Sequence, residues 1–253
     1  METYLIILMN LFLFALLGWL FSLYSGKVTH VDSMWSLFFL LAFLTGFCSI
    51  ENPSSVHLAT LTALFLWSTR LSIYLTTRNW NKSEDIRYQN IRRNNEPNFK
   101  WKSLYIIFLF QALLALIISM PLISIINNPD NYNFFTQLGL GLFLIGFSIE
   151  IVADRQLRNF LKKRSSQDVL NSGLWKYSRH PNYFGECVIW WGFYIISIPD
   201  GNLLNLFSPI LMTYLLVKIS GADLMESTIK QRRPSYEKYI KTTSKFIPWP
   251  PKK

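Results

Sequence analysis

Residues 177–192, YSRHPNYFGECVIWWG, join a cationic turn directly to a nearly uncharged aromatic segment. Arg179 and His180 precede Pro181, and proline suits the first turn of a helix because its missing N–H would be unpaired there anyway. The sequence therefore predicts a helix that begins at Pro181. Its free backbone N–H groups, the positive end of its dipole and Arg179 would converge on one point, which predicts a site for a phosphate or carboxylate.

Further polar side chains follow on this predicted helix. Glu186 comes four residues after Asn182, so the two share one face, and Tyr183 beside them supplies a donor and a flat stacking surface. A membrane helix with a basic flank and an aromatic belt has a similar outline. Arginine, histidine, asparagine, tyrosine and glutamate within eight positions exceed what an anchor needs, which favours a binding site.

A second polar segment precedes this one. Asp154 and Arg158 are four residues apart, so a helix that continues past the membrane surface would present an acid and a base on one side. An exposed salt bridge worth a few tenths of a kcal/mol explains the pair equally well when it is taken alone. With Tyr177 and Arg179 brought close, Arg158 would contribute to one electropositive mouth.

The composition places these residues in a membrane protein. The chain has 253 residues, of which 51% are hydrophobic and 16% charged, and the apolar residues are bunched. We expect an all-α helix bundle with about seven crossings, built on the apolar segments 3–24, 33–50, 56–75, 103–128, 132–148, 187–199 and 202–217. The last two are short, so they form either a helical hairpin or a re-entrant pair.

Basic residues support this topology. If the amino terminus is outside, the inner segments 25–32, 76–102, 154–186 and 218–253 hold 24 of the 25 lysines and arginines, and only Arg70 lies elsewhere. This is the positive-inside pattern, and it places the carboxyl terminus in the cytosol. Both a bacterial inner membrane and the endoplasmic reticulum fit it. We expect a single membrane domain, 1–253, with the first four crossings and the inner loop in 1–126 and the cofactor-binding helices and an amphipathic tail in 127–253.

Several ligand classes are disfavoured. The net charge of +10 lies beside membrane spans, so anionic headgroups and an anionic cofactor explain it better than nucleic acid. The three histidines are scattered and the two cysteines form no CxxC motif, which disfavours a metal site. The sequence leaves the oligomeric state open, although Gly139, Gly141 and Gly146 would permit close helix contacts.

Two inner segments leave alternatives open. Asp32 is predicted at the inner end of the second span, either as an N-cap or as a site residue. The tail from 221 to 249 is either an amphipathic helix on the membrane surface or a lid over the mouth.

The motifs together resemble a known group of proteins. Residues 173–186 (GLWKYSRHPNYFGE), 190–192 (WWG), 220–226 (SGADLME), 233–239 (RPSYEKY) and 243–249 (TSKFIPW) are similar to an uncharacterised branch of polytopic membrane proteins related to the steroid 5-alpha-reductases. The resemblance extends upstream through Asp32, Trp35 and the loop with Arg87 and Tyr88. It therefore covers most of the chain.

This resemblance implies a seven-helix fold that binds NADPH from the cytosolic side and reduces an activated carbon–carbon double bond in a lipid such as a steroid, sterol or polyprenol enone. It places the following residues around the cofactor: Asp154, Arg158, Tyr177, Arg179, His180, Asn182, Tyr183, Glu226 and Tyr239. Glu186 is assigned a catalytic role. The animal enzymes carry a glutamate and tyrosine pair on early helices, for which Asp32 and Tyr88 are the substitutes here, and their histidine pair in the tail is absent.

Two other functions remain open. The Arg-His-Pro turn followed by a glutamate and a tyrosine-rich tail also resembles the isoprenylcysteine and phospholipid methyltransferases, which use S-adenosylmethionine. Those enzymes usually show paired glutamates where this chain has only Glu226, and the Asn-Tyr-Phe-Gly-Glu string favours the reductases. A non-catalytic lipid-binding protein on the same scaffold is the third reading.

Overall fold

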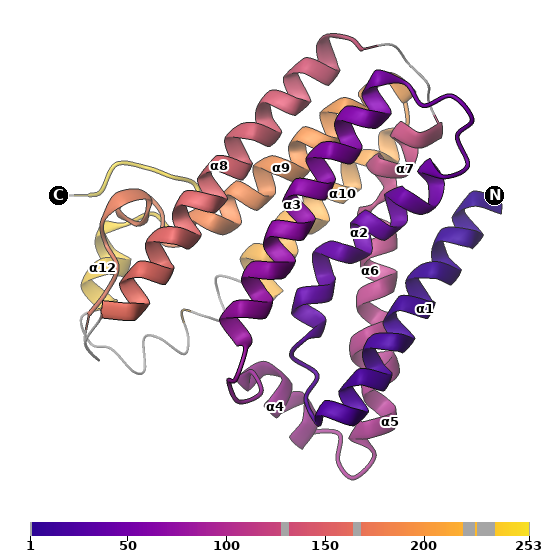
Figure 1. Cartoon of the computed structure of the whole chain (residues 1–253). Coiled ribbons are helices and arrows are strands. Elements are labelled where there is room, and N and C mark those ends of the chain that lie inside the picture. The colour runs from indigo at the N-terminus through magenta and orange to yellow at the C-terminus, as the bar shows by residue number, and fades with distance from the viewer. Residues whose placement is uncertain (1, 128–131, 164–167, 220–225, 227–235, 253) are drawn as a thin grey trace. The chain divides into compact units, whose positions relative to one another are not determined.

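The computed structural model describes residues 2–127, 132–163, 168–219, 226 and 236–252, and these residues form helices and connecting segments without a strand (Figure 1). The predicted all-α fold is confirmed. Internal contacts divide the chain into unit 1, Met1–Tyr132, and unit 2, Asn133–Lys253. The single membrane domain and its predicted division between 126 and 127 stay predictions.

Unit 1 contains three long apolar helices, a short polar helix and a segmented fourth span. Its elements are α1 (Glu2–Ser25), α2 (Val31–Phe47), α3 (Ser55–Asn79), α4 (Ile86–Arg93), α5 (Phe99–Ser103), the π-helical turn η1 (Leu104–Leu109), α6 (Phe110–Ile118) and α7 (Met120–Asn127).

Unit 2 is built around two antiparallel helices. Its elements are α8 (Phe134–Lys163), the 3₁₀ turn η2 (Gly173–Lys176), α9 (Pro181–Ser197), the 3₁₀ turns η3 (Ile198–Asp200) and η4 (Leu203–Leu206), α10 (Phe207–Tyr214), the π-helical turn η5 (Leu215–Ile219) and α12 (Tyr236–Thr242). The helix predicted to begin at Pro181 does so, and α8 continues past residue 148 as expected.

The helices identify an integral membrane protein. Among the described residues, four helical stretches are long and apolar enough to cross a bilayer, namely Glu2–Ser25, Ser55–Asn79, Phe99–Ile118 and Phe134–Lys163. The stretches Val31–Phe47 and Leu203–Ile219 are apolar but shorter. Four crossings are thus supported by length, while the full count of seven and the orientation in the membrane stay predictions.

Two local details differ from expectation. The predicted span 103–128 is interrupted at Ser119, because Pro121 near the start of α7 lacks an N–H and its ring is incompatible with an undisturbed preceding turn. Asp32 is not an N-cap: His30 holds that position, and Asp32 lies inside the first turn of α2. Its carboxylate is therefore available for partners outside the helix.

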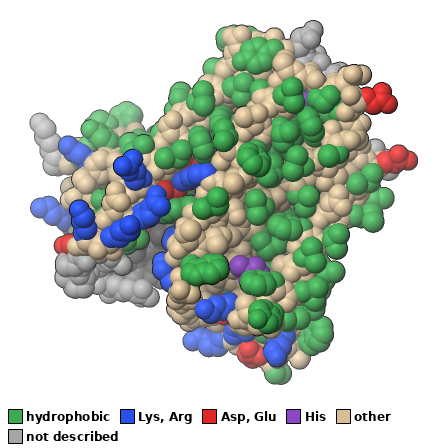
Figure 2. Space-filling model, in the orientation of Figure 1, with side chains coloured by type: hydrophobic (Ala, Val, Ile, Leu, Met, Phe, Trp, Pro, Cys, Tyr) green, Lys and Arg blue, Asp and Glu red, His purple; other side chains and the backbone are tan. Residues whose placement is uncertain are grey.

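One end of unit 1 is basic and its flanks are apolar. Lysine and arginine side chains gather at the end that carries α4 and α5, whereas apolar side chains cover much of the visible surface along the helices (Figure 2). Among the exposed apolar residues of α1 are Leu5, Met9, Leu13 and Leu17. Such a surface suits contact with acyl chains, and such an end suits contact with headgroups.

Paired glycines bring α8 and α9 into backbone contact. Gly139 faces Gly192 and Gly146 faces Gly185, and the two glycines on each helix are seven positions apart. A Cβ on Gly146 would lie 2.5 Å from the carbonyl oxygen of Gly185, and one on Gly139 would lie 2.5 Å from that of Gly192. Side chains larger than hydrogen are therefore excluded from this interface. Gly141, in contrast, meets nothing within 4 Å.

We expect Gly146→Ala to destabilise the protein by about 1–3 kcal/mol, because the added methyl group meets backbone atoms that cannot rotate away. Gly141→Ala is the matched control, since the same change at an open helical position is neutral or slightly stabilising. Thermal melting of both variants in detergent checks this. Equal melting temperatures would contradict the close contact.

Candidate functional site

The first turn of α9 begins at an ordered basic corner of unit 2. His180 has an extended φ of −139° before the helix begins at Pro181, and its backbone N–H donates to the hydroxyl of Ser178 at 3.1 Å. The Arg179 N–H donates to the carbonyl of Ser244 at 2.9 Å. The corner is therefore fixed by main-chain and local hydrogen bonds, and its side chains are left to bind other groups.

Arg179, His180 and Glu226 form the charged centre of this corner. Arg179 Nε lies 3.2 Å from Glu226 Oε1, and His180 Nε2 lies 3.0 Å from the same oxygen. The Arg179 and His180 side chains are buried, and Glu226 is 14% exposed. The structure thus brings together three residues that the sequence placed at the cofactor.

Part of this centre has unsatisfied polar atoms. Arg179 Nη1 is buried, and no residue within the described ranges accepts a hydrogen bond from it. The same holds for the amide oxygen Oδ1 of Asn182 in the next turn. A buried guanidinium donor without an acceptor is costly, and a ligand phosphate or carboxylate would satisfy it.

Asn182 links the two central helices. Its side-chain amide donates to Asp154 Oδ1 on α8 at 3.1 Å. Asp154 is buried, as are Glu150 one turn earlier and Glu186 on α9. The glycine contact at 146 and 185 brings α8 and α9 together, and all three carboxyl groups are buried on these two helices.

The carboxyl-terminal tail is hydrogen-bonded to the same corner within unit 2. Tyr239 donates its hydroxyl to the carbonyl of Trp175 at 2.5 Å, and Ser178 donates to the carbonyl of Phe246 at 2.7 Å. The Trp249 N–H donates to the carbonyl of Tyr177 at 3.0 Å. Residues 236–249 are therefore tied to the segment that carries Arg179. The structure of 220–225 and 227–235 lies outside the described residues, so the lid remains a prediction.

Two tail tyrosines stay neutral beside the charged centre. Burial raises the pKa of Tyr236, and the nearby charge of Glu226 raises it further. Burial likewise raises the pKa of Tyr239, and the ring centroids of Tyr239 and Tyr236 are 5.5 Å apart. Both hydroxyls are thus hydrogen-bond donors at any physiological pH.

The remaining predicted cofactor residues lie at the edge of the corner. The Tyr183 ring stacks on His180 with centroids 5.6 Å apart. Tyr177 is 43% exposed, and Arg158 is exposed on α8. The structure therefore gathers Asp154, Asn182, Arg179, His180 and Glu226 into contacts, and it leaves Arg158 and Tyr177 at the surface.

A second cluster lies at the basic end of unit 1. Tyr88 donates its hydroxyl to Asp32 Oδ1 at 2.6 Å, and Arg87 Nη2 lies 2.7 Å from Asp32 Oδ2. Arg87 also binds Asp85, with Nε 2.9 Å from Oδ1. Gln111 approaches the Tyr88 hydroxyl at 3.4 Å. The expected pairing of Asp32 with Tyr88 is thus present, although 56 positions separate them.

The charges in this cluster reinforce one another. Burial raises the pKa of Tyr88, and the Asp32 carboxylate raises it further. Burial alone would raise the pKa of Asp85, but the hydrogen bonds and charge of Arg87 outweigh it and lower that pKa. The resulting state is a neutral phenol held by a carboxylate whose charge Arg87 balances, which is an arrangement able to hydrogen-bond a carbonyl.

Two contributors were not assigned a role from the sequence. Arg87 pairs with Asp32, and Tyr236 lies near the charge of Glu226. Tyr236 stands three positions before Tyr239, which is a helical spacing and was the available signal. Among the described residues, no group of three His, Cys, Asp or Glu side chains is placed to hold a metal ion.

Comparisons with known proteins match nearly the whole chain. The family described as "Protein of unknown function (DUF1295)" matches residues 18–243. An uncharacterised protein, C594.04c of Schizosaccharomyces pombe, is 26% identical over 91% of this chain and 75% of its own length. Steroid 5-alpha-reductase DET2 of Solanum lycopersicum is 28% identical over 42% of each chain. No solved structure matches. The relation to methyltransferases receives no support from these comparisons.

We expect Tyr88→Phe to lower the free energy of unfolding by about 1 kcal/mol at neutral pH, because Asp32 loses one hydrogen bond but keeps its ion pair with Arg87. The pKa of Tyr88 is raised in the folded protein, so the folded state keeps the phenol proton to higher pH than the unfolded chain. The contribution of Tyr88 to the free energy of unfolding is therefore complete below the unfolded pKa of about 10 and is lost as pH rises through the folded pKa. When the free energy of unfolding is measured at increasing alkaline pH, it should therefore fall less steeply for the variant than for wild type.

Tyr24→Phe is the control, since Tyr24 is 89% exposed. It should follow the wild-type pH profile. A Tyr88→Phe profile that coincides with both would show that the phenol does not interact with Asp32 in the protein.

Proposed function

The chain belongs to the DUF1295 family, and from this membership and the geometry of unit 2 we propose that it is a membrane-embedded reductase that uses NADPH to reduce an activated carbon–carbon double bond in a lipid. The observation that carries the proposal is the buried Arg179 guanidinium at the start of α9. It supplies fixed positive charge beside the free N–H groups of a helix, which is how proteins bind phosphate.

The residues present fit an anionic dinucleotide. Arg179 Nη1 has no acceptor among the described residues, so a phosphate oxygen would complete its hydrogen bonding. The stacked rings of His180 and Tyr183 offer a flat surface, and the buried neutral Tyr236 and Tyr239 exclude water from one side. The partial similarity to steroid 5-alpha-reductase DET2 supports NADPH as that dinucleotide.

When bound, NADPH would supply a hydride to the beta carbon of an alpha,beta-unsaturated carbonyl compound. The alpha carbon would take a proton, and the hydride donor would be oxidised to NADP⁺. Asp154 and Asn182 hold α8 to the first turn of α9, which follows Arg179 in the chain. The buried carboxyl of Glu186 lies one turn beyond Asn182, and we assign it to proton handling there.

The acid that we assign in unit 1 is Tyr88. Its raised pKa keeps a proton on Oη, and Asp32 orients the hydroxyl by accepting that proton in a hydrogen bond. Arg87 pairs with the other oxygen of Asp32 and so holds this carboxyl group in place. A carbonyl oxygen that carries developing negative charge is the natural alternative acceptor for this hydroxyl.

One observation favours a second candidate. Glu226 places a carboxylate 3.0 Å from His180, and a carboxylate suits the ammonium group of S-adenosylmethionine. A methyltransferase would use this charge, whereas a dinucleotide reductase would use Arg179. The two functions therefore predict opposite effects of neutralising the two side chains.

We expect NADPH to raise the melting temperature of the purified protein and S-adenosylhomocysteine to leave it unchanged, because a ligand that binds only the folded state stabilises it. Arg179→Ala should weaken NADPH binding at least tenfold, since a charge-assisted hydrogen bond is worth about 1.5–3 kcal/mol. Glu226→Gln should leave NADPH binding unchanged or tighter. Lys176→Ala is the control, because it removes an exposed charge from the neighbouring turn.

Other outcomes separate the alternatives. Stabilisation by S-adenosylhomocysteine that Glu226→Gln abolishes would establish the methyltransferase. Stabilisation by lipid but by neither nucleotide would establish a lipid-binding protein. If Arg179→Ala does not fold, Glu226→Gln and the wild-type ligand series still decide between these outcomes.

We expect deuterium transfer from C4-labelled NADPH to a lipid. The reconstituted protein should be incubated with the labelled cofactor and a total lipid extract, and mass spectrometry should find one lipid class that gains a deuterium together with a proton from water. Arg179→Ala should abolish the label, and Lys176→Ala should retain it. A protein that binds NADPH but labels no lipid would not be this reductase.

A further inference from the structure

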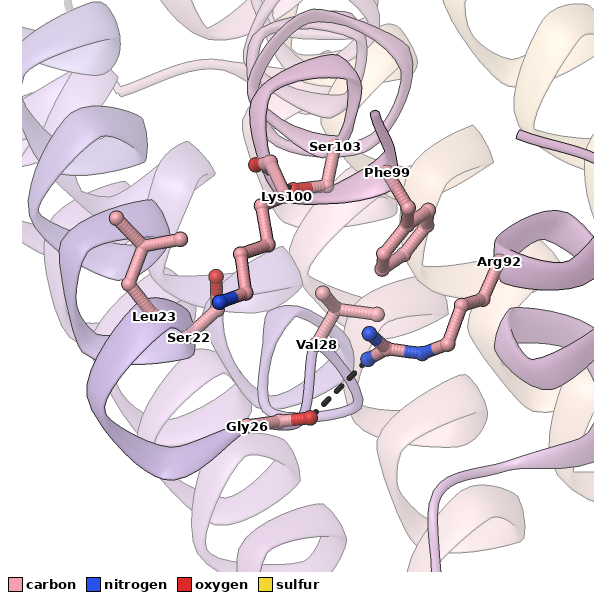
Figure 3. A pocket seen from close by; sticks show the side chains of 8 residues that line it. All are labelled: Ser22, Leu23, Gly26, Val28, Arg92, Phe99, Lys100 and Ser103. Atoms are coloured by element: carbon pink, nitrogen blue, oxygen red, sulfur yellow. Dashed lines mark hydrogen bonds between the residues drawn. The ribbon is translucent and has the colours of Figure 1, made fainter. Parts of the chain in front are cut away.

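A small pocket lies at the basic end of unit 1, between the last turn of α1, the turn that follows it, the end of α4 and the start of α5 (Figure 3). Its lining includes Ser22, Gly26, Arg92, Phe99 and Lys100. None of the residues that line it belongs to the Asp32 cluster or to unit 2. The proposed reductase chemistry therefore leaves this pocket unexplained.

Arg92 contributes a rigid positive charge to the pocket. Its guanidinium lies 4.2 Å over the Phe99 ring, and its Nη2 donates to the carbonyl of Gly26 at 3.1 Å (Figure 3). Glu84 binds the same guanidinium, with Oε2 2.9 Å from Nε. These contacts hold the Arg92 side chain in one position before any ligand binds. Binding of a ligand there would therefore cost little side-chain conformational entropy.

Lys100 contributes a second charge that is not engaged. Figure 3 shows its side chain reaching from α5 into the pocket opposite Arg92. Its carbonyl accepts hydrogen bonds from Trp19 Nε1 at 2.9 Å and from the Ser103 hydroxyl at 2.8 Å, so the backbone that carries it is anchored. No described residue forms a hydrogen bond or ion pair with its ammonium group.

The local balance of charge is positive. Glu84 contributes a carboxylate at the pocket wall, where it accepts a hydrogen bond from the Val28 N–H at 2.9 Å and pairs with Arg92. Lys100 and the adjacent Lys27, which stands between two residues of the lining, exceed that single negative charge. The complementary ligand is therefore an anion.

The surroundings of the pocket are apolar and aromatic. Leu20 and Phe21 on α1 are 48% and 53% exposed, and Trp101 and Tyr105 are 68% and 56% exposed. Trp19 packs against Trp101 with centroids 5.6 Å apart, as in the aromatic belts at membrane surfaces. An anion bound beside this surface would have room for acyl chains along α1.

We propose that this pocket binds the phosphate of an anionic phospholipid, with the headgroup between Arg92 and Lys100 and the acyl chains against the exposed face of α1. The proposal does not rest on the reductase function. Basic pockets between membrane helices bind anionic headgroups by the same physical means. Such a lipid would join α1 to α5 at the membrane surface.

The test compares phosphatidylglycerol with phosphatidylcholine of the same acyl chains, and both with inorganic phosphate, on the purified full-length protein by native mass spectrometry. We expect wild type to prefer phosphatidylglycerol and Lys100→Ala to bind it about fivefold more weakly, since each basic residue contributes about 1 kcal/mol. Lys102→Ala is the matched control, because residues two apart on a helix point to different faces and Lys102 does not line the pocket.

Melting temperatures without added lipid establish that both variants fold. Equal weakening by Lys100→Ala and Lys102→Ala would show that the lipid only adsorbs to a basic surface, which overturns the site. Inorganic phosphate binding that depends on Lys100 in the absence of lipid would also overturn it, because the ligand would then be a soluble anion. Equal binding of the two phospholipids would exclude charge recognition.

Discussion

The backbone contact between α8 and α9 is the constraint on which the candidate site of unit 2 depends. Glycines at two levels let the helices approach until carbonyl oxygens of one helix occupy the space of a Cβ on the other. At that separation a short asparagine side chain can reach Asp154 across the interface. If the two helices were farther apart, only longer side chains could bridge them. Longer side chains lose more rotamer freedom on ordering and position a ligand less well.

The basic corner illustrates a balance between stability and binding. Arg179 is buried, and a buried guanidinium is tolerable only with counter-charge and hydrogen-bond acceptors. Glu226 supplies the charge but leaves Nη1 without an acceptor among the described residues. A strong hydrogen-bond donor is therefore left without an acceptor among the described residues, as in preorganised anion sites. The packing of the surrounding residues offsets the free-energy cost of burying it.

Much of this arrangement was predictable from local sequence. Pro181 marks the start of α9 because its ring fixes φ, and the apolar runs mark the long helices because a bilayer requires them. The pairing of Asp32 with Tyr88 came from resemblance, not from periodicity. What local sequence could not supply was the partner of each charge: Arg87 joins Asp32 only because the chain after α3 turns back on α2, and Asp32 sits inside the helix rather than capping it. The helix break at Ser119 was not predicted either, because a single proline within a long apolar segment does not by itself distinguish a broken span from a continuous one.

The tail of unit 2 is held largely through main-chain atoms. Ser244, Phe246 and Trp249 contribute a carbonyl, a carbonyl and an N–H to the segment that carries Arg179. Bonds of this kind do not depend on side-chain identity, so these positions can diverge while the geometry of the corner is kept. Related proteins can therefore share these main-chain contacts with little sequence similarity in the tail, and superposition of backbones would detect them where alignment of residues does not.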